Sequence, residues 1–198
     1  MTLRQRFIKR SFDLVVSALG LAATWWIILV AFVAASIDTR SNGFFIQMRI
    51  GRWGKPFPVI KIKTMRPVAD YTTTVTTAHD PRITRTGAFF RRTKIDELPQ
   101  LINVLLGQMS LVGPRPDVSG YMDRLSGDDA EILALRPGIT GPATLKYKDE
   151  EQILAAQTDP KRYNDEIIWP DKVRLNRRYM HEWSFWGDIG YIWRTVFP

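Results

Sequence analysis

The sequence predicts a mostly helical α+β protein in which a long apolar helix precedes a mixed, polar domain. Residues 14–37 are almost wholly apolar, which is long enough for a membrane helix. Two short runs, 44–47 and 57–63, flank a glycine-containing turn and predict a small β-hairpin. From residue 80 onward, helical periodicity recurs between glycine and proline breaks, so the rest of the chain is expected to be helical.

The length and composition limit the number of domains and the kinds of chemistry that the chain can perform. A chain of 198 residues fits one compact domain with an appended segment, here residues 1–40 ahead of a domain at 41–198. The net charge of +8 indicates anionic partners, namely phosphates, nucleic acid or an anionic membrane surface. The chain has no cysteine, and its two histidines, His79 and His181, are far apart. Disulfides, thiol chemistry, a histidine zinc site and a Ser-His-Asp triad are therefore not expected.

A basic segment leads into the apolar run. Its cations and apolar residues interleave at helical spacing: Arg4, Arg6, Lys9 and Arg10 with Leu3 and Phe7. Such a segment is typical of an amphipathic helix at an anionic headgroup surface. The alternative is a disordered basic tail, against which the directly following apolar run argues.

Positive charge on both sides of residues 14–37 bears on the membrane topology. Cations precede the run at 4–10 and follow it at 40–63, which argues that both ends stay on the cytoplasmic face. A helix that dips into one leaflet and returns satisfies this pattern, and a straight span is the alternative. A signal peptide does not fit, because the apolar run is too long.

An acidic pair, Asp96 and Glu97, stands directly ahead of an apolar run that contains Pro99. Since proline is tolerated in the first turn of a helix, the spacing predicts a helix with Asp96 as its N-cap and an end at Gly107. Backbone N–H groups and the helix dipole favour negative charge there, so we expect Asp96 to stay ionised. An ionised aspartate suits a nucleophile or a metal ligand, and the plainer alternative is a helix cap.

Basic residues near the acidic pair are candidates for phosphate binding. Arg115 stands between two prolines that stiffen the backbone, so its guanidinium loses little entropy when it binds a phosphate. Arg91 and Arg92 can neutralise a diphosphate or simply pair with the acids. Arg136 opens a rigid turn whose backbone N–H groups can approach a phosphate or a base, or which is only a connector. Lys61 and Lys63 form the cationic face of a strand, which is also typical of a solvated edge.

The remaining segments carry weaker patterns. Residues 67–79 are rich in threonine, lack helical periodicity and predict a mobile loop. Short helical segments are expected at 87–93, 117–135 and 146–175. Residues 175–198 are rich in tryptophan and tyrosine, which predicts amphipathic helices at a membrane interface or packed in the core.

Four ordered motifs give the chain a resemblance to a known family. They are Asp80-Pro-Arg-Ile-Thr-Arg, Phe90-Arg-Arg-Thr-Lys-Ile-Asp-Glu-Leu-Pro-Gln-Leu, Met109-Ser-Leu-Val-Gly-Pro-Arg-Pro and Arg136-Pro-Gly-Ile-Thr-Gly. From about Lys9 to the C-terminus, the chain resembles the bacterial sugar transferases, the small monotopic phosphoglycosyl transferases.

The resemblance implies transfer of a sugar-1-phosphate from a UDP-sugar to a polyprenol phosphate, undecaprenyl phosphate, with release of UMP. This is the first membrane step of glycan biosynthesis. Asp96 is then the nucleophile that forms a covalent phosphosugar-aspartyl enzyme, and Glu97 assists the lipid phosphate or binds metal. Mg²⁺ bridges Asp96 and the diphosphate and lowers the repulsion between the two anions. The resemblance further implies that residues 41–198 form a catalytic domain with interfacial helices, on the cytoplasmic face of the bacterial inner membrane.

The resemblance also implies substrate contacts for five cations: Arg91, Arg115, Arg136, Lys61 and Lys63. It favours Arg91 over Arg92. One departure is Gln108, where the family often has an aspartate.

The family's membrane helix is re-entrant and is broken at a Ser-Pro pair. Trp25 and Trp26 stand at the matching positions here, so the resemblance implies a break without proline, at Gly20 or Thr24. A straight span remains the rival topology.

Two other functions fit the same residues. A direct single displacement at the same site needs no covalent intermediate. A membrane-anchored basic module without catalysis binds nucleic acid or anionic lipid, although such a binder gains nothing from an acidic pair. We therefore expect UDP-sugar, polyprenol phosphate and membrane lipid as partners, and no nucleic acid. A homo-oligomer stays open, as do the sugar and the glycan pathway.

Overall fold

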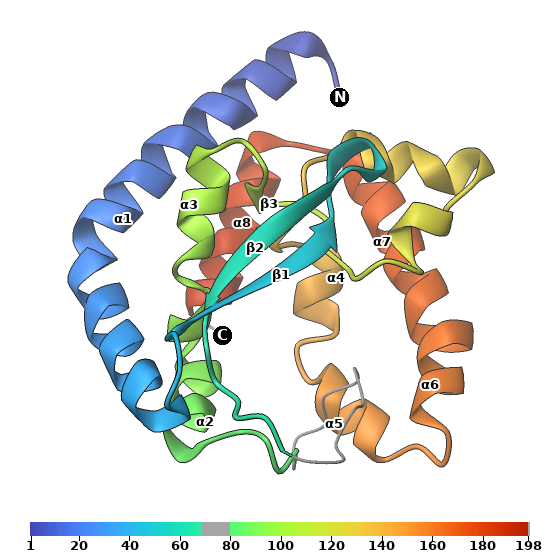
Figure 1. The fold of residues 1–198 in the computed structure, drawn as a ribbon. Helices are drawn as coiled ribbons and strands as arrows, with labels where there is room; N and C mark the ends of the chain where they lie inside the picture. The colour runs from blue at the N-terminus through green and yellow to red at the C-terminus, as the bar shows by residue number, and fades with distance from the viewer. Residues whose placement is uncertain (69–79, 198) are drawn as a thin grey trace.

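The computed structural model describes residues 1–68 and 80–197, so most of the predicted loop at 67–79 lies outside the described part. The fold is mostly helical α+β, as predicted (Figure 1). The helices and strands, in chain order, are α1 (Leu3–Thr39), β1 (Phe44–Ile50), β2 (Pro56–Ile62), α2 (Arg85–Thr93), α3 (Gln100–Leu105), β3 (Ser110–Val112), β4 (Gly138–Thr140), α4 (Pro142–Lys146), α5 (Glu150–Ala155), α6 (Pro160–Tyr163), α7 (Trp169–His181) and α8 (Phe185–Val196). Short 3-10 segments occur at η1 (Arg52–Gly54), η2 (Ile95–Glu97), η3 (Met122–Arg124) and η4 (Gly127–Ala134), and η5 (Asn164–Ile168) is π-helical.

The long helix α1 runs unbroken through the whole apolar segment. The Thr2 side chain caps its first turn, and Arg40 ends it in the left-handed conformation. The implied break at Gly20 or Thr24 was wrong, because the Thr24 hydroxyl donates to the Gly20 carbonyl, 2.7 Å away, within continuous helix. Hydroxyls that bond back to the preceding turn bend a helix, and α1 arches around one side of the core (Figure 1).

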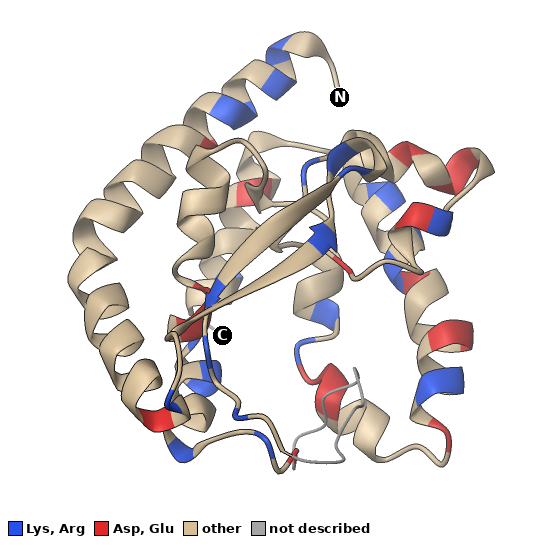
Figure 2. Cartoon of the chain, in the orientation of Figure 1, with Lys and Arg blue, Asp and Glu red and all other residues tan. Residues whose placement is uncertain are grey.

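One face of α1 packs on the core and the other is exposed. Ile28, Ala31 and Ala35 are buried together with Ile62 of β2 and Phe90 of α2. On the outer face Trp25 and Trp26 are 61% and 55% exposed. Within the described chain, α1 is the one helix long and apolar enough to cross a membrane, with a mean hydropathy of 2.2 over its most apolar window. Between Leu14 and Ile37 the helix has no charged residue (Figure 2).

The predicted hairpin is confirmed, with a longer first strand than expected and a second strand shifted by one residue. β1 and β2 pair antiparallel from Phe44↔Ile62 to Ile50↔Pro56. The sequence predicted strands at 44–47 and 57–63, whereas the ladder extends β1 to Ile50 and ends β2 at Ile62. The extension arises because every residue between Phe44 and Ile50 has a partner across the hairpin, whatever its own strand propensity.

A second, parallel pair of strands was not predicted. β3 and β4 pair through Ser110↔Gly138 and Val112↔Thr140, so the segment expected as a turn after Arg136 contains a strand. An ideal Cβ on Gly138 would lie 2.1 Å from the backbone nitrogen of Gly113. Only glycine allows the two backbones to approach this closely, and the contact joins the segments that begin at Gly113 and Arg136.

The C-terminal half follows the predicted helical pattern in shorter pieces than expected. The segment at 117–135 forms η3 and η4 rather than α-helix, and at its start the Gly120 N–H is bonded to the Asp123 carboxylate. The segment at 146–175 divides into α5, α6, η5 and the start of α7. The aromatic segment at 175–198 forms the end of α7 and α8, with Tyr179 and Trp183 in the core and Trp186 77% exposed.

Candidate active site

The acidic pair lies in a tight turn between α2 and α3. Lys94 ends α2 with a φ of 58°, and the chain turns directly into η2, which contains Asp96 and Glu97. Ile95 and Leu98 pack against the α1–β2–α2 core on either side of the acids, which fixes the turn. The prediction that Asp96 caps a helix was wrong: regular helix starts at Gln100, because the 3-10 bonds Glu97 N to Lys94 O and Leu98 N to Ile95 O take its place. The predicted end at Gly107 agrees with its φ of 79°, directly after α3.

Asp96 is a buried carboxyl group with an open hydrogen-bonding position. It is 8% exposed, and its Oδ1 is buried without a hydrogen-bond partner in the described chain. Burial, followed by the charge of Glu97, raises the pKa of Asp96 to about 6, while Lys61, Lys94 and Arg91 act in the opposite direction. Asp96 is therefore mostly ionised at neutral pH, as expected, although burial rather than a helix terminus controls its pKa.

The pKa of Glu97 is shifted in the opposite direction from that of Asp96. Its Oε1 accepts hydrogen bonds from Lys61 Nζ at 3.1 Å and from Arg115 Nη2 at 3.2 Å. Burial opposes its ionisation, but the charges of Lys61, Arg115 and Lys94 outweigh burial and lower the pKa of Glu97. The side chain is 11% exposed, so these partners act with little solvent screening. Glu97 stays a carboxylate throughout the physiological range.

Arg115 reaches the acidic pair from the β3 side of the site. The backbone around it is fixed by Gly113 N to Thr140 O and Gly138 N to Pro114 O, at 2.9 and 2.7 Å. In the described chain its guanidinium donates one hydrogen bond, to Glu97, and the side chain is 41% exposed. Its remaining N–H groups are available to an incoming anion.

Arg91 joins the same group from α2. Its positive charge acts on Asp96, and its guanidinium is paired with Glu151 of α5. Arg92 differs in position, because its guanidinium lies over the Phe89 ring, 6.0 Å from the centroid. The structure therefore places Arg91, and not Arg92, against the acidic pair.

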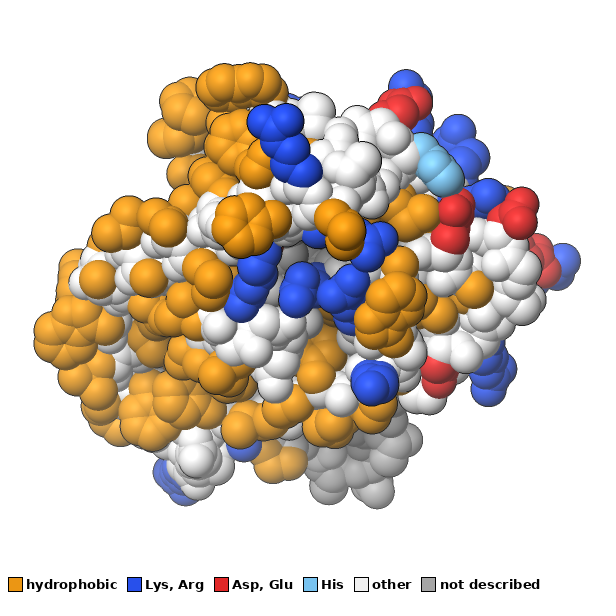
Figure 3. Space-filling view, turned by 90° about the horizontal axis from the view of Figure 1, so that it is seen from above, with side chains coloured by type: hydrophobic (Ala, Val, Ile, Leu, Met, Phe, Trp, Pro, Cys, Tyr) orange, Lys and Arg blue, Asp and Glu red, His pale blue; other side chains and the backbone are white. Residues whose placement is uncertain are grey.

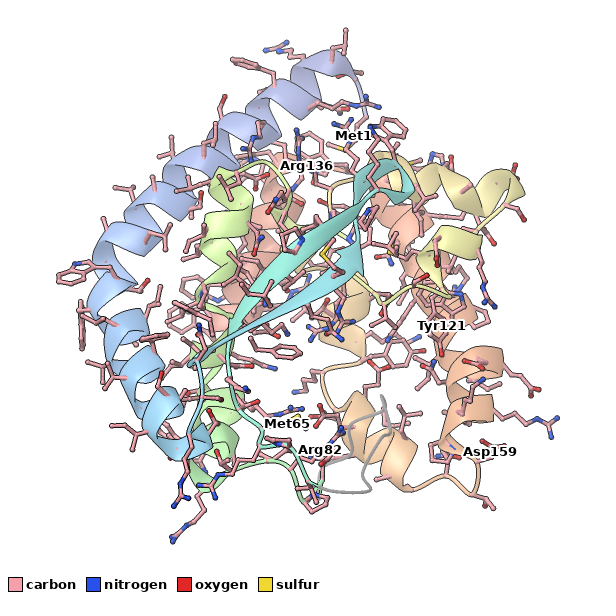
Figure 4. All side chains as sticks on the ribbon, in the orientation of Figure 1. Met1, Met65, Arg82, Tyr121, Arg136 and Asp159 are labelled. Carbon is pink, nitrogen blue, oxygen red and sulfur yellow. The ribbon has the colours of Figure 1, made fainter. Side chains whose placement is uncertain are left out.

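Two cations named from the sequence do not join the group around Asp96. Lys63 is half-buried and donates to the Ser41 hydroxyl, just beyond the end of α1. Arg136 donates from Nε to the Gly107 carbonyl at 2.9 Å, beyond the C-terminal end of α3, whereas Asp96 precedes the N-terminal end of that helix. Figure 4 shows Arg136 at the same end of the molecule as Met1.

Sequence reasoning missed Arg49 of β1. Its Nε and Nη2 both donate to the Gln47 side-chain oxygen, at 3.1 and 2.7 Å, and its charge interacts with those of Asp117 and Arg115. Lys172 acts on Asp117 from α7 and pairs with Glu150 at 2.7 Å. The signal for Arg49 was the i, i+2 spacing of Gln47 and Arg49, which places both on one face of a strand.

A divalent cation suits the oxygen donors of this site. Carboxylate oxygens are hard metal ligands. The Oδ1 of Asp96, next to Glu97 in the sequence, has no hydrogen-bond partner in the described chain and can coordinate a metal ion. In the described chain no three acidic or histidine side chains converge, so protein ligands alone do not complete a metal shell. Mg²⁺ commonly takes one or two carboxylates together with substrate phosphates, and the pair Asp96 and Glu97 fits that pattern.

The acidic pair lies apart from the two most evident surface hollows. One, of about 220 Å³, is lined by α6 and η5 residues such as Tyr163 and Glu166, and the other, of about 530 Å³, by residues such as Trp169 and His181. Neither is lined by Asp96 or Glu97. The candidate site therefore does not coincide with either hollow.

Two carboxylates lie among lysine and arginine side chains, on a turn that packs against a long apolar helix. Comparison with known proteins shows the family to which the chain belongs. Residues 4–198 match the family described as bacterial sugar transferase. The chain belongs to the bacterial sugar transferase family.

Individual relatives extend over nearly the whole chain. It is 34% identical over 205 residues to the UDP-glucose:undecaprenyl-phosphate glucose-1-phosphate transferase of Escherichia coli strain K12, covering 97% of this chain and 40% of that protein. It is 35% identical over 189 residues to an uncharacterized sugar transferase of Bacillus subtilis, covering 96% and 85%. It is 33% identical over 209 residues to the undecaprenyl-phosphate galactose phosphotransferase of Salmonella typhimurium, covering 96% and 40%. The chain thus spans less than half the length of two of these three relatives.

Proposed function

We propose that the protein transfers a sugar-1-phosphate from a UDP-sugar to undecaprenyl phosphate and releases UMP. The observation that carries the proposal is the pair of neighbouring carboxylates in unlike states, Asp96 unpartnered and Glu97 held by Lys61 and Arg115. The names of the relatives support the substrate classes, since they act on undecaprenyl phosphate. Those names include glucose and galactose, so the sugar of this chain stays open.

In the first proposed step, Asp96 attacks the sugar-bearing β-phosphorus of the UDP-sugar. The bond from that phosphorus to the bridging oxygen breaks, UMP leaves with the electron pair, and a phosphosugar-aspartyl ester forms. Arg115 and Arg91 stabilise the phosphate oxygens, and Arg91 exchanges Glu151 for the substrate. Asp96 and Glu97 would hold a Mg²⁺ ion, which would neutralise part of the charge of the diphosphate.

In the second step, an oxygen of the lipid phosphate attacks the same phosphorus and Asp96 leaves as a carboxylate. The products are the undecaprenyl diphosphosugar and the free enzyme. Glu97 orients the acceptor through Lys61 and Arg115, which it fixes by charge-assisted hydrogen bonds. Because Glu97 is ionised at all physiological pH values, its role does not depend on proton transfer.

We further propose that α1 enters and leaves the same, cytoplasmic leaflet of the bacterial inner membrane. Both ends of the helix are tied to one folded body, through Lys9 to Asp188 at 2.7 Å and Asp38 to Arg66 at 2.6 Å. A spanning helix would separate its ends by a hydrocarbon layer of about 30 Å. The exposed outer face of α1 would then lie in the leaflet and its inner face on the domain.

The test is UMP release across a panel of UDP-sugars, with undecaprenyl phosphate present, using wild type and Asp96→Asn. Release by the wild type alone supports the proposal. A sugar-labelled protein adduct, seen when the lipid is left out and absent from Asp96→Asn, supports the covalent step. Turnover that never labels the protein favours a direct displacement.

A non-catalytic membrane module is the remaining alternative. It predicts no UMP from any UDP-sugar, and lipid or nucleic-acid binding unchanged by Asp96→Asn. The buried, unpartnered Asp96 oxygen argues against it, because a polyanion-binding surface gains nothing from such a group.

A further inference from the structure

Four arginines from three separate segments gather beyond the C-terminal end of α3, at the opposite end of that helix from Asp96. They are Arg6 and Arg10 of α1, Arg52 of η1, and Arg136 ahead of β4, and we refer to them as the arginine cluster. Figure 3 looks down on this end of the molecule and shows lysine and arginine side chains gathered at its centre.

Two members of the cluster meet at the end of α3. Arg10 donates from Nη1 to the Val104 carbonyl at 2.7 Å and from Nη2 to the Leu105 carbonyl at 3.1 Å. Arg136 donates from Nε to the Gly107 carbonyl at 2.9 Å. An ideal Cβ on Gly107 would lie 3.3 Å from Arg10 Nη2, so both guanidiniums adjoin the same residue.

Arg52 links the hairpin tip to the same place. It donates from Nε to the Ala134 carbonyl at 2.9 Å, two residues before Arg136. Burial, then the positive charges of Arg136 and Arg6, lower the pKa of Arg52, so the three cations are close enough to repel one another. Arg6 is exposed one helical turn before Arg10, on the same face of α1.

The acceptors recorded for the cluster's side chains are neutral carbonyls. Within residues 1–68 and 80–197, no carboxylate forms an ion pair with any of the four guanidiniums. The nearest acid along α1, Asp13, is buried and accepts the Leu111 N–H at 3.1 Å. The charge of Asp13 acts on Arg10, but it is one carboxylate against four guanidiniums, and helix-end carbonyls carry only partial negative charge. The cluster therefore keeps a net positive charge.

Large apolar side chains are exposed directly beside the cluster. Leu3 and Phe7 are 83% and 74% exposed on the same turns of α1, and Leu106 is 65% exposed between the carbonyls that bind Arg10 and Arg136. Trp53 is exposed next to Arg52, whose guanidinium lies 4.9 Å from the indole centroid. Figure 3 shows hydrophobic side chains on either side of the central cations. Cations bordered by exposed tryptophan and leucine are typical of the headgroup level of a bilayer.

We propose that the arginine cluster binds the phosphate of an anionic phospholipid headgroup. The net positive charge of the cluster supplies the complementarity, and the exposed apolar residues beside it enter the acyl region around the same lipid. A soluble phosphate would meet the same charges but would leave those apolar residues in water. The site is separate from Asp96, and it does not depend on sugar-phosphate transfer.

The test counts phosphatidylglycerol bound to the full-length protein by native mass spectrometry, in an uncharged detergent, with phosphatidylcholine for comparison. The wild type should retain phosphatidylglycerol in preference. The double variant Arg6→Ala/Arg52→Ala should weaken that binding by about fivefold for each arginine removed. The matched control, Arg162→Ala/Arg174→Ala, removes two exposed arginines from α6 and α7 and should bind as the wild type does.

Equal loss of phosphatidylglycerol in the two double variants, or no loss in either, overturns the proposal. Displacement of the lipid by millimolar UMP or inorganic phosphate also overturns it, in favour of a soluble anion. If Arg52→Ala fails to fold, Arg6→Ala alone decides, because the Arg6 side chain is exposed and its removal breaks no recorded contact. Counting bound lipid requires no turnover. A negative result would therefore overturn the lipid site without bearing on the proposed transfer reaction.

Discussion

Two adjacent carboxylates, Asp96 and Glu97, share one turn but experience different surroundings. Asp96 is buried next to a negative charge and has a raised pKa, whereas Glu97 is clamped between Lys61 and Arg115 and has a lowered pKa. Neighbouring acids whose pKa values are pushed apart commonly divide two roles between them. Under the proposed function, Asp96 is the nucleophile, and Glu97 holds Lys61 and Arg115 in place.

The raised pKa of Asp96 predicts a pH limit for the first half-reaction. Only the carboxylate attacks phosphorus, so the rate of UMP release should fall about tenfold per pH unit below about pH 6 and level off above it. The measurement is single-turnover UMP release without lipid acceptor, from pH 4.5 to 8. A rate that stays flat down to pH 5 would contradict the assignment of Asp96 as the attacking group.

The same shift predicts a stabilising effect of Asp96→Asn. A carboxyl whose folded-state pKa is raised from 3.8 to about 6 contributes its stability below pH 3.8 and loses it as the pH rises through 6. Two pKa units correspond to a cost of at most about 3 kcal/mol at pH 8. Asn removes the charge, so its melting temperature should exceed that of the wild type at pH 8.

The control for that comparison is the pH dependence. Near pH 4, where the wild-type carboxyl is protonated, the difference in melting temperature between Asp96→Asn and wild type should shrink to nearly nothing. An equal difference at both pH values would mean that Asn acts through packing and not through charge.

At the scale of elements, one buried ion pair joins both ends of the chain. Lys9 of α1 donates to Asp188 Oδ2 at 2.7 Å, and the same carboxylate accepts from Tyr179 at 2.8 Å and Trp183 at 3.0 Å. The side chains of Lys9 and Asp188 are 11% and 3% exposed. α1, α7 and α8 therefore meet at a single carboxylate.

Asp188→Asn should be strongly destabilising, by about 3–5 kcal/mol, because it leaves the Lys9 ammonium buried without its counter-charge. Urea unfolding in uncharged detergent measures the change. The matched control is Glu166→Gln, which breaks the exposed pair with Arg162 and should cost less than about 0.5 kcal/mol. Similar losses in the two variants would contradict a structural role for the Asp188 junction.

Most of these elements could be predicted from local pattern, and the exceptions have physical reasons. The long apolar run predicted α1, alternation around a glycine-containing turn predicted the hairpin, and helical periodicity predicted the C-terminal helices. β4 was missed because its three residues, Gly-Ile-Thr, carry no alternation, and its partner β3 is distant in sequence. The start of α3 was misplaced because Pro99 also fits the 3-10 turn that precedes the helix.

The site residues that are neighbours in the sequence could be predicted. The contacts between residues from distant segments could not. Asp96 and Glu97 are adjacent, and Lys61 and Arg115 were named from strand alternation and proline spacing. Their convergence on Glu97 depends on how β2 and β3 pack around η2, which local pattern does not encode. Arg136 was grouped with them from its place at a rigid turn and from the family resemblance, and its guanidinium instead turns to the far end of α3.

For the whole molecule, the tethering of both helix ends predicts a labelling pattern. Because the chain has no cysteine, Arg4→Cys and Arg40→Cys each introduce one thiol. Both should react with a membrane-impermeant maleimide in inside-out vesicles and remain unreactive in intact spheroplasts. Labelling of the two variants from opposite sides would establish a spanning helix instead.

The shared packing of α1 and the domain determines what a shortened version of this chain can be. Ile28, Ala31 and Ala35 supply one wall of the cluster on which Ile95 and Leu98 rest. A fragment that begins at residue 41 would open that wall to water beside the turn that carries Asp96. Removing α1 would thus remove one side of the packing that holds this turn. A detergent-free fragment therefore requires polar replacements on that inner wall and not simple truncation.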